Sequence, residues 1–348
     1  MSNIPPPNQA LDAQRLGLYL QIQGIFDTPE IRLEKIGGGQ SNPTYFVTGG
    51  KRTVVLRKQP DGDVLPSAHR MDREHRVLTA LRDATDVPVP RTLLYCADAS
   101  VFGTPFYLME KLEGRIFPDY RLDGVSPAER TAMYRSMAET FAALHRVDWR
   151  AAGLADYGRH SGFFARQIAR WTEQWRLSKT GESADIDALI ARLPAMVPQD
   201  DETVLCHGDF RMGNLMFHPT EPRVVGVLDW ELSTLGHPMS DLAFNCIAWH
   251  TAPSEYGGLA DLDLAALGIP TEAEYLAHYC KAAGRADATT PFHLAFAMFR
   301  FAVIFEGIAA RALAGSAASD NAASVGQLSA AFARRAVECL DSRDLAPA

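Results

Sequence analysis

Residues 205–214 read LCHGDFRMGN, and shortly after them residues 225–231 read VGVLDWE. The first stretch places the carboxylate of Asp209 five positions before the amide of Asn214. The second is an apolar run that ends in Asp229, with Glu231 two positions further on. Phosphoryl transfer needs a carboxylate beside the acceptor hydroxyl and oxygen ligands for a divalent cation. The order of these residues favours that chemistry, although each Asp alone fits a structural role, capping a turn or ending a strand.

The patterning on either side of these stretches predicts two lobes of different character. From about residue 31 to residue 111 the chain alternates and turns like strands, with one helical stretch near 71–81. Beyond Gly114 it is mostly helical, apart from a β-rich interruption at 204–229. We therefore expect an α+β fold, with a small β-rich lobe at 1–111 and a larger helical lobe at 112–348. Helices are predicted at 128–146, 163–177, 272–283, 292–313 and 322–340.

Composition excludes several classes of function. The chain has 348 residues, 47 % of them hydrophobic, and a net charge of −8, which disfavours binding to nucleic acid. The apolar stretch 292–313 contains Arg300, Glu306 and Arg311, so we interpret it as a core helix and expect no membrane span. The N-terminus does not resemble a signal peptide, and the five cysteines are scattered. These features are typical of a cytoplasmic protein with reduced thiols.

The His-Gly-Asp of residues 207–209, with Asn214 and Asp229, resembles the signature of the aminoglycoside phosphotransferase and choline-kinase-like family. The resemblance covers nearly the whole chain and implies a protein-kinase-like fold of two lobes. It further implies that Asp209 orients and deprotonates the acceptor hydroxyl, and that Asn214 and Asp229 bind magnesium. Glu231 is positioned to reach a second cation directly or through water. Arg211 lies where many protein kinases have a lysine that neutralises the transferring phosphate, although a solvated arginine fits the position as well.

A glycine run lies between the first two predicted strands, where this family has its nucleotide-covering loop. Glycines let backbone N–H groups approach phosphates closely. The resemblance therefore implies that Gly38 and Gly39 contact the nucleotide, with Ser41 and Asn42 as additional side-chain donors. By itself the run is only a glycine-rich hairpin.

The next strand departs from the protein-kinase pattern, because its Val-Val-Leu is followed by Arg57 and not by lysine. Strand alternation points Lys58 to the opposite face, so Arg57 is the candidate for the α and β phosphates. Glu74 matches the carboxylate that pairs with this cation in the family. The segment between the lobes implies that backbone groups of Glu110 and Leu112 bind the adenine edge.

Residues 38–45, 55–58, 65–69 and 229–233 are most similar to a subgroup that is found beside acyl-CoA metabolism, in some organisms fused to acyl-CoA dehydrogenase domains. This likeness implies a hydroxyl on an acyl or other small metabolite as the phosphate acceptor, and not an aminoglycoside. ATP and Mg²⁺ are the expected cofactors, with GTP left open. The acceptor and the oligomeric state are not determined by the sequence.

Two other interpretations of the function remain. A kinase-fold binding module without turnover would lack Asp209, Asn214 or Asp229, and all three are present; only Arg57 favours it. A metal-dependent hydrolase would use His207 and His237 with the two aspartates, but it leaves Asn214 and the glycine-rich lobe unexplained.

Overall fold

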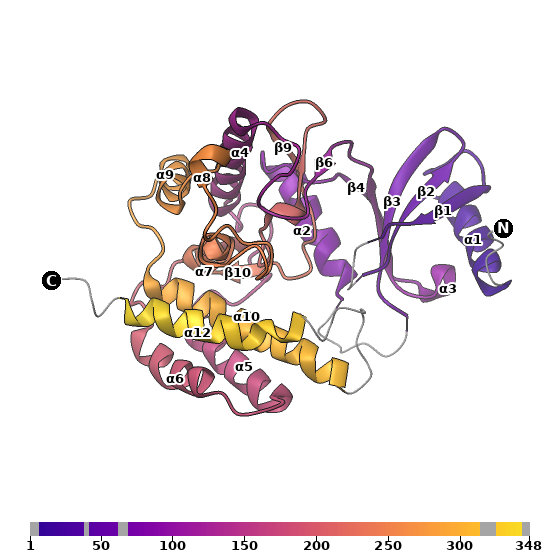
Figure 1. The fold of residues 1–348 in the computed structure, drawn as a ribbon. Coiled ribbons are helices and arrows are strands. Elements are labelled where there is room, and N and C mark those ends of the chain that lie inside the picture. The colour runs from indigo at the N-terminus through magenta and orange to yellow at the C-terminus, as the bar shows by residue number, and fades with distance from the viewer. Residues whose placement is uncertain (1–6, 38–41, 62–68, 314–324, 343–348) are drawn as a thin grey trace. The chain divides into compact units, whose positions relative to one another are not determined.

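The computed structural model of the protein describes residues 7–37, 42–61, 69–313 and 325–342 (Figure 1). The chain divides into two compact units. The first comprises Met1–Gly114 together with Val225–Glu231, and the second comprises Arg115–Val224 and Leu232–Ala348. This division differs from the predicted one, because the segment that carries Asp229 belongs to the first unit. The backbone N–H of Val227 in that segment donates to the carbonyl of Pro88, 2.8 Å away.

The first unit is built on one antiparallel sheet with strand order β1-β2-β3-β5-β4. The strands and the following helix α2 form where the apolar patterning predicts them. The elements are α1 (Pro7–Ile22), β1 (Ile31–Lys35), β2 (Thr44–Gly49), β3 (Arg52–Lys58), α2 (Met71–Ala84), β4 (Thr92–Cys96), α3 (Ala99–Phe102) and β5 (Phe106–Glu110).

The alternation along β3 explains how this unit directs its charges. Val54 and Leu56 are buried in the core that also includes residues of α1 and α3, whereas Arg57 points to the other face, toward Glu74 of α2. Lys58 follows the core face, where its ammonium lies 2.8 Å from Asp61 and over the ring of Phe102. The predicted division of Arg57 and Lys58 between opposite faces is thus confirmed.

The second unit is mainly helical. Its helices are α4 (Pro127–His145), α5 (Phe163–Ser178), α6 (Ala184–Arg192), α7 (Pro238–Cys246), α8 (Leu264–Leu267), α9 (Glu272–Ala283), α10 (Pro291–Leu313) and α12 (Leu328–Asp341), with short 3-10 turns η1 (Leu193–Met196), η2 (Met212–Asn214) and η3 (Ile247–His250). Its short strands are β6 (Arg115–Ile116), β7 (Val204–Cys206), β8 (Leu215–Phe217) and β10 (Thr234–Gly236), while β9 (Val224–Val227) runs from this unit into the first. The predicted start of the last helix at 322 lies outside the described residues.

Helix α10 forms the centre of this unit and packs against α5, α7 and α12, the last of which runs alongside it (Figure 1). Among the described residues it is the one helix long and apolar enough to cross a membrane, and 72 % of its apolar window is buried inside the protein. The prediction of a core helix is therefore confirmed. Strands β7 and β10 pair antiparallel, with Cys206 opposite Thr234, and the loop that follows β7 carries the residues predicted to be catalytic.

Candidate active site

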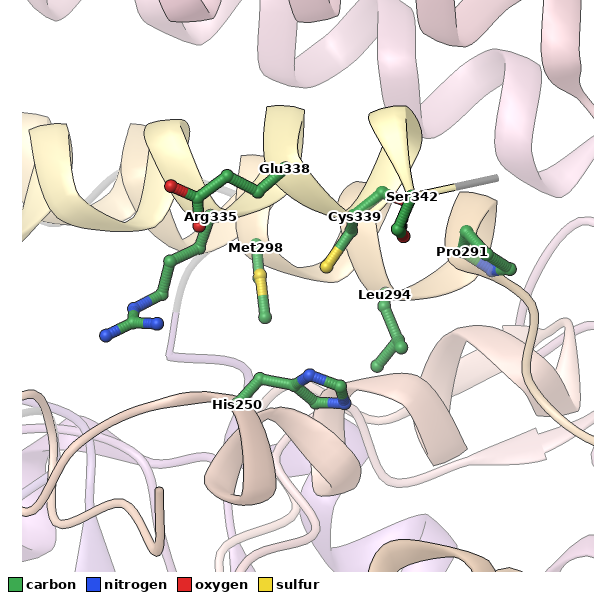
Figure 2. A pocket seen from close by; sticks show the side chains of 8 residues that line it. All are labelled: His250, Pro291, Leu294, Met298, Arg335, Glu338, Cys339 and Ser342. Atoms are coloured by element: carbon green, nitrogen blue, oxygen red, sulfur yellow. Dashed lines mark hydrogen bonds between the residues drawn. The ribbon is translucent and has the colours of Figure 1, made fainter. Parts of the chain in front are cut away.

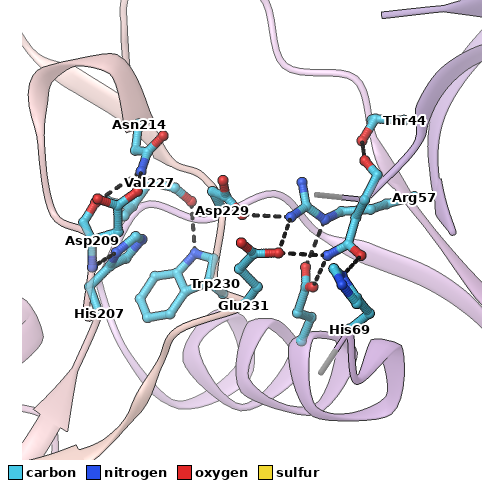
Figure 3. A network of polar contacts seen from close by, with 12 residues as sticks. Thr44, Arg57, His69, His207, Asp209, Asn214, Val227, Asp229, Trp230 and Glu231 are labelled. Atoms are coloured by element: carbon cyan, nitrogen blue, oxygen red, sulfur yellow. Dashed lines mark hydrogen bonds and ion pairs between the residues drawn. The ribbon is translucent and has the colours of Figure 1, made fainter. Parts of the chain in front are cut away.

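The loop after β7 brings Asp209 and Asn214 together, as Figure 3 shows, and Arg211 joins them. The amide nitrogen of Asn214 donates to the backbone carbonyl of Asp209 at 2.9 Å and to its carboxylate Oδ2 at 2.7 Å. Arg211 Nε donates to the same carboxylate oxygen at 3.3 Å. Two side chains on one short loop thus fix the carboxylate of Asp209.

Asp241 of α7 holds the backbone of this loop. Its two carboxylate oxygens accept the N–H groups of His207 at 2.7 Å and Gly208 at 2.8 Å. Gly208 has φ +82°, and an added Cβ would lie 2.5 Å from the carbonyl oxygen of Leu232, so only glycine fits there. Asp241 therefore braces the loop through backbone hydrogen bonds.

The brace extends further into the helical core than the sequence indicated. His145 Nε2 lies 3.4 Å from Asp241 Oδ2, and its Nδ1 lies 2.7 Å from the hydroxyl of Tyr279. Burial alone would raise the pKa of Asp241, but the contacts with His145 and the loop N–H groups outweigh it, and the pKa is lowered. Asp241 is therefore held ionised. On the loop's other side, Arg300 of α10 donates to the carbonyl of Gly208 at 3.0 Å.

In the first unit, Arg57 stands among three carboxylates (Figure 3). Its guanidinium lies 2.9 Å from Glu74, 2.5 Å from Asp229 and 3.6 Å from Glu231. Burial works against the charge of Arg57, but these carboxylates raise its pKa. The predicted pairing of Arg57 with Glu74 is confirmed. Asp229 has φ +66°, a left-handed backbone conformation that Asp tolerates better than most residues.

Asn42 has a different role from the predicted one. Its side chain is 2 % exposed, and its amide nitrogen donates to Glu74 at 3.0 Å and to Glu231 at 2.9 Å. Its amide oxygen faces His69 Nδ1 at 2.8 Å. Because all three contacts are to protein groups, Asn42 ties the carboxylates together, and its side chain is not a free phosphate donor.

Sequence reasoning missed two members of this cluster. His69 contacts Asn42 from a backbone with φ 55°, and the buried hydroxyl of Tyr107 donates to Glu74 at 3.0 Å. The signal for Tyr107 was available, because alternation along β5 places it opposite Arg57 on β3. No local signal marked His69, whose contact joins residues 27 positions apart.

The remaining predicted nucleotide contacts have mixed outcomes. Gly38, Gly39 and Ser41 lie outside the described residues. Glu110 donates its backbone N–H to the carbonyl of Arg91 at 2.9 Å, so this N–H is not available to an adenine edge. The prediction then rests on the carbonyl of Glu110 and on Leu112, which follows β5.

The donor set of each unit fits a magnesium ion. Asn214 uses its nitrogen toward Asp209, which leaves its amide oxygen on the other side of the side chain as a ligand atom. Asp229 contacts Arg57 through Oδ1, and its side chain is 32 % exposed. Glu231 is engaged by Asn42 and Arg57, and its side chain is 21 % exposed. Oxygen ligands of this kind are those that Mg²⁺ prefers.

The hydrolase reading is not supported. His237 uses both ring nitrogens within the protein: Nδ1 accepts the N–H of Met239, and Nε2 lies 2.7 Å from Asp200. His207 Nδ1 accepts the N–H of Asp209. Because both ring nitrogens of His237 are already bonded, this histidine offers no ligand to a metal.

A cavity lies between α10, α12 and η3, away from the loop after β7. It is lined by Leu294, Met298, Arg335 and Cys339 among others (Figure 2). Its volume is about 260 Å³. His250 lies on its opposite wall and binds Glu272 at 2.8 Å. None of the residues predicted to be catalytic or to bind the nucleotide lines it.

Comparison with known proteins agrees with this arrangement. Acyl-CoA dehydrogenase family member 10 of Mus musculus is 41 % identical over 334 residues, which are 95 % of this chain but 31 % of that protein. A crystal structure from Ralstonia eutropha, named after the aminoglycoside phosphotransferases, is 44 % identical, with a TM-score of 0.86 over 94 % of this chain and 98 % of that one. Spectinomycin phosphotransferase, solved with ADP and spectinomycin, shares the fold at 12 % identity, with a TM-score of 0.63 over 94 % of this chain and 98 % of that one.

The chain thus spans about a third of the length of the mouse relative and nearly all of the bacterial one. These likenesses confirm the α+β, protein-kinase-like fold and the resemblance to the subgroup associated with acyl-CoA dehydrogenase domains. The phosphotransferase enzyme family itself matches residues 32–291. Because that match takes in the sheet of the first unit, the braced loop after β7 and the Asp229 segment, the chain belongs to the phosphotransferase enzyme family.

Proposed function

We propose that the protein is an ATP- and magnesium-dependent kinase that transfers the γ-phosphate to a hydroxyl of a small molecule, of a hydroxyacyl type and not an aminoglycoside. The observation that carries the proposal is the fixed carboxylate of Asp209, held by Asn214 and Arg211 on a loop that Asp241 braces. A carboxylate held in this way is suited to orient an acceptor hydroxyl.

In this mechanism the acceptor oxygen forms a bond to the γ-phosphorus, and the bond to the bridging oxygen breaks, so that ADP leaves. The hydroxyl proton passes to the carboxylate of Asp209. Arg57 would hold the α and β phosphates, and Asn214 and Asp229 would hold Mg²⁺, while Glu231 could reach a second cation directly or through water. When bound, Mg²⁺ would supply positive charge that stabilises the phosphates.

The kind of acceptor follows from charge near Asp209 and from the relatives. Arg211 contacts the Asp209 carboxylate, and Arg300 is close enough to Asp209 and to Arg170 for their charges to affect its pKa. Arginines in this place repel a polycation such as an aminoglycoside. The mouse relative is named for acyl-CoA dehydrogenases, which supports an acyl-type acceptor.

Nucleotide binding is the first test. A ligand that binds only the folded state raises the melting temperature. At a concentration one hundred times its dissociation constant, it adds about 2.7 kcal/mol to the free energy of unfolding. We expect Mg-ATP to raise the melting temperature of the wild type and Asp229→Ala to lose this shift. Asp209→Asn keeps the shift and loses phosphate transfer. A parallel titration with Mg-GTP decides between the two nucleotides.

The absence of a shift with either nucleotide contradicts the proposal and favours a binding module without turnover. Arg57 was the one sequence feature in favour of that module, and its pairing with Glu74 removes this argument.

A further inference from the structure

The segment between η3 and α8 contains a backbone conformation that needs an explanation. Tyr256 and the following Gly257 both have positive φ, +67° and +69°. Two successive residues of this kind are typical of turns that use Asn and Gly, and a bulky aromatic residue there is an outlier.

Strain by itself marks no site, but the tyrosine ring has a definite position. It meets the rings of Phe301 and Phe305 of α10 at centroid distances of 5.2 and 5.6 Å. With Phe301 and Arg211 it lines a cavity of about 10 Å³. This volume is at or below the roughly 10–15 Å³ that a single water needs. The remaining lining residues are Tyr120, Phe244, Ile247, Ala248 and Thr251.

This small cavity adjoins the fixed carboxylate, because Arg211 lines it and also donates to Asp209. Tyr256 as a whole is 42 % exposed, but burial of its hydroxyl raises the pKa of that group. The charges of Arg211 and Asp209 affect this pKa in opposite directions, so the three groups are close neighbours. The ring of Tyr256 thus fills space next to the carboxylate that is proposed to take the acceptor's proton.

The segment is held in place from α12. Arg335 pairs with Glu255, the residue before Tyr256, at 2.5 Å, and the same carboxylate oxygen accepts the N–H of Ala252 at 3.0 Å. Gly258 returns the chain by donating to the carbonyl of Ala252 at 3.1 Å. The turn around Tyr256 is therefore fixed at both ends by these contacts.

We propose that Tyr256 is a specificity-determining residue that makes the site choose an alcohol with an apolar body over water. Its ring closes the apolar cavity beside Asp209 and Arg211, and only an acceptor whose body replaces the ring against Phe301 and Phe305 reaches the carboxylate. This inference rests on the proposed kinase function. Holding a strained tyrosine at this position is the structural cost of excluding water.

The test is the hydrolysis of Mg-ATP without an acceptor, measured on the full chain. In this reaction water forms the bond to the γ-phosphorus, the bridging oxygen leaves with ADP, and the proton of water passes to Asp209. Tyr256→Ala opens the cavity and is expected to raise the hydrolysis rate about five- to tenfold. Tyr256→Phe keeps the ring and should hydrolyse ATP at the wild-type rate. Leu177→Ala, which truncates a residue 76 % exposed on α5, is the matched control and should change nothing.

Tyr256→Asn separates the exclusion of water by the ring from the effect of the substitution on stability. Asn lacks the ring but tolerates positive φ better than Ala, so it should hydrolyse ATP as fast as Tyr256→Ala while melting at a higher temperature. Hydrolysis that follows melting temperature across the series, or that equals the wild-type rate in Tyr256→Ala, overturns the inference. The melting-temperature shift with Mg-ATP separates the two proposals. If Tyr256→Ala keeps this shift but does not hydrolyse ATP faster than the wild type, the role given to Tyr256 is wrong and the kinase function stands. A wild type without the shift contradicts the kinase function, and the role given to Tyr256 with it.

Discussion

At the scale of single residues, Arg57 shows how an arginine, at a strand position where protein kinases have a lysine, organises its neighbours. A guanidinium is a planar fork that can serve several carboxylates, whereas an ammonium is a compact point charge. Arg57 uses this geometry to contact Glu74, Asp229 and Glu231 together. Asn42 then joins Glu74 to Glu231 from the other side.

Arg57→Lys should therefore be a damaging exchange despite the conserved charge. We expect a loss of about 1–3 kcal/mol of unfolding free energy, because a buried carboxylate loses its partner, and a smaller melting-temperature shift with Mg-ATP. Lys58→Arg is the mirrored control on the opposite face of β3 and should leave the nucleotide shift unchanged. Equal behaviour of the two variants in urea unfolding and nucleotide titration would contradict the role given to Arg57.

Glu74 gives a pH dependence of known sign. Burial raises its pKa to about 7, against the opposing charge of Arg57, and the side chain is 2 % exposed. The folded state then binds a proton more tightly than the unfolded state. The stability from this proton is complete below about pH 4.5 and is lost as pH rises through 7.

We expect the unfolding free energy of the metal-free wild type to fall between pH 5 and 7.5 by an amount on the order of 1–3 kcal/mol from this group. Glu74→Gln should remove that part of the slope, as measured by urea unfolding in EDTA. A variant with an unchanged slope would show that Glu74 is ionised throughout this range.

At the scale of elements, the loop after β7 depends on α7 more than on its own sequence. Asp241→Asn replaces one acceptor oxygen with an N–H donor that then faces a backbone N–H. We expect a loss of about 2–4 kcal/mol of stability and at least a hundredfold loss of ATP turnover, because a buried donor is left unpaired. Asp187→Asn on the exposed face of α6 is the matched control. Turnover within a few-fold of the wild type would mean that the loop keeps its shape without this brace.

Local patterns predicted the elements well but not the contacts between distant ones. The apolar spacing of α4, α5, α9 and α10 and the alternation of β2, β3 and β5 are properties of short windows, and the predicted bounds agree with the structure to within a few residues. The pairing of Asn42 with Glu231 joins residues 189 positions apart. Such a contact depends on how elements pack, and no window of sequence contains it.

The same distinction applies to the candidate site. Asp209, Arg211 and Asn214 lie on one short loop, so the contacts among them are local in sequence. The left-handed turn at Tyr256 could not be predicted, because sequence statistics favour Asn or Gly there and the ring is held by packing against α10.

At the scale of the whole molecule, the first unit is discontinuous in sequence. Residues 1–114 lack the segment Val225–Glu231, which supplies Asp229 to Arg57 and the N–H of Val227 to Pro88. We expect the isolated fragment 1–114 to melt at a lower temperature than the same fragment with residues 225–231 joined by a flexible linker, measured by circular dichroism. Coincident melting curves would show that the segment adds no stability to this unit.

That discontinuity also bears on how the protein is made. On the ribosome the chain emerges from the N-terminus at about 5–20 residues per second. All strands of the five-stranded sheet have been synthesised by Gly114, but the last segment of the first unit ends at Glu231. For a time on the order of ten seconds the nascent sheet carries a buried arginine without two of its partners. During synthesis this unit therefore stays incomplete until Glu231 has emerged, and a chaperone that binds it in this interval would protect it from misfolding.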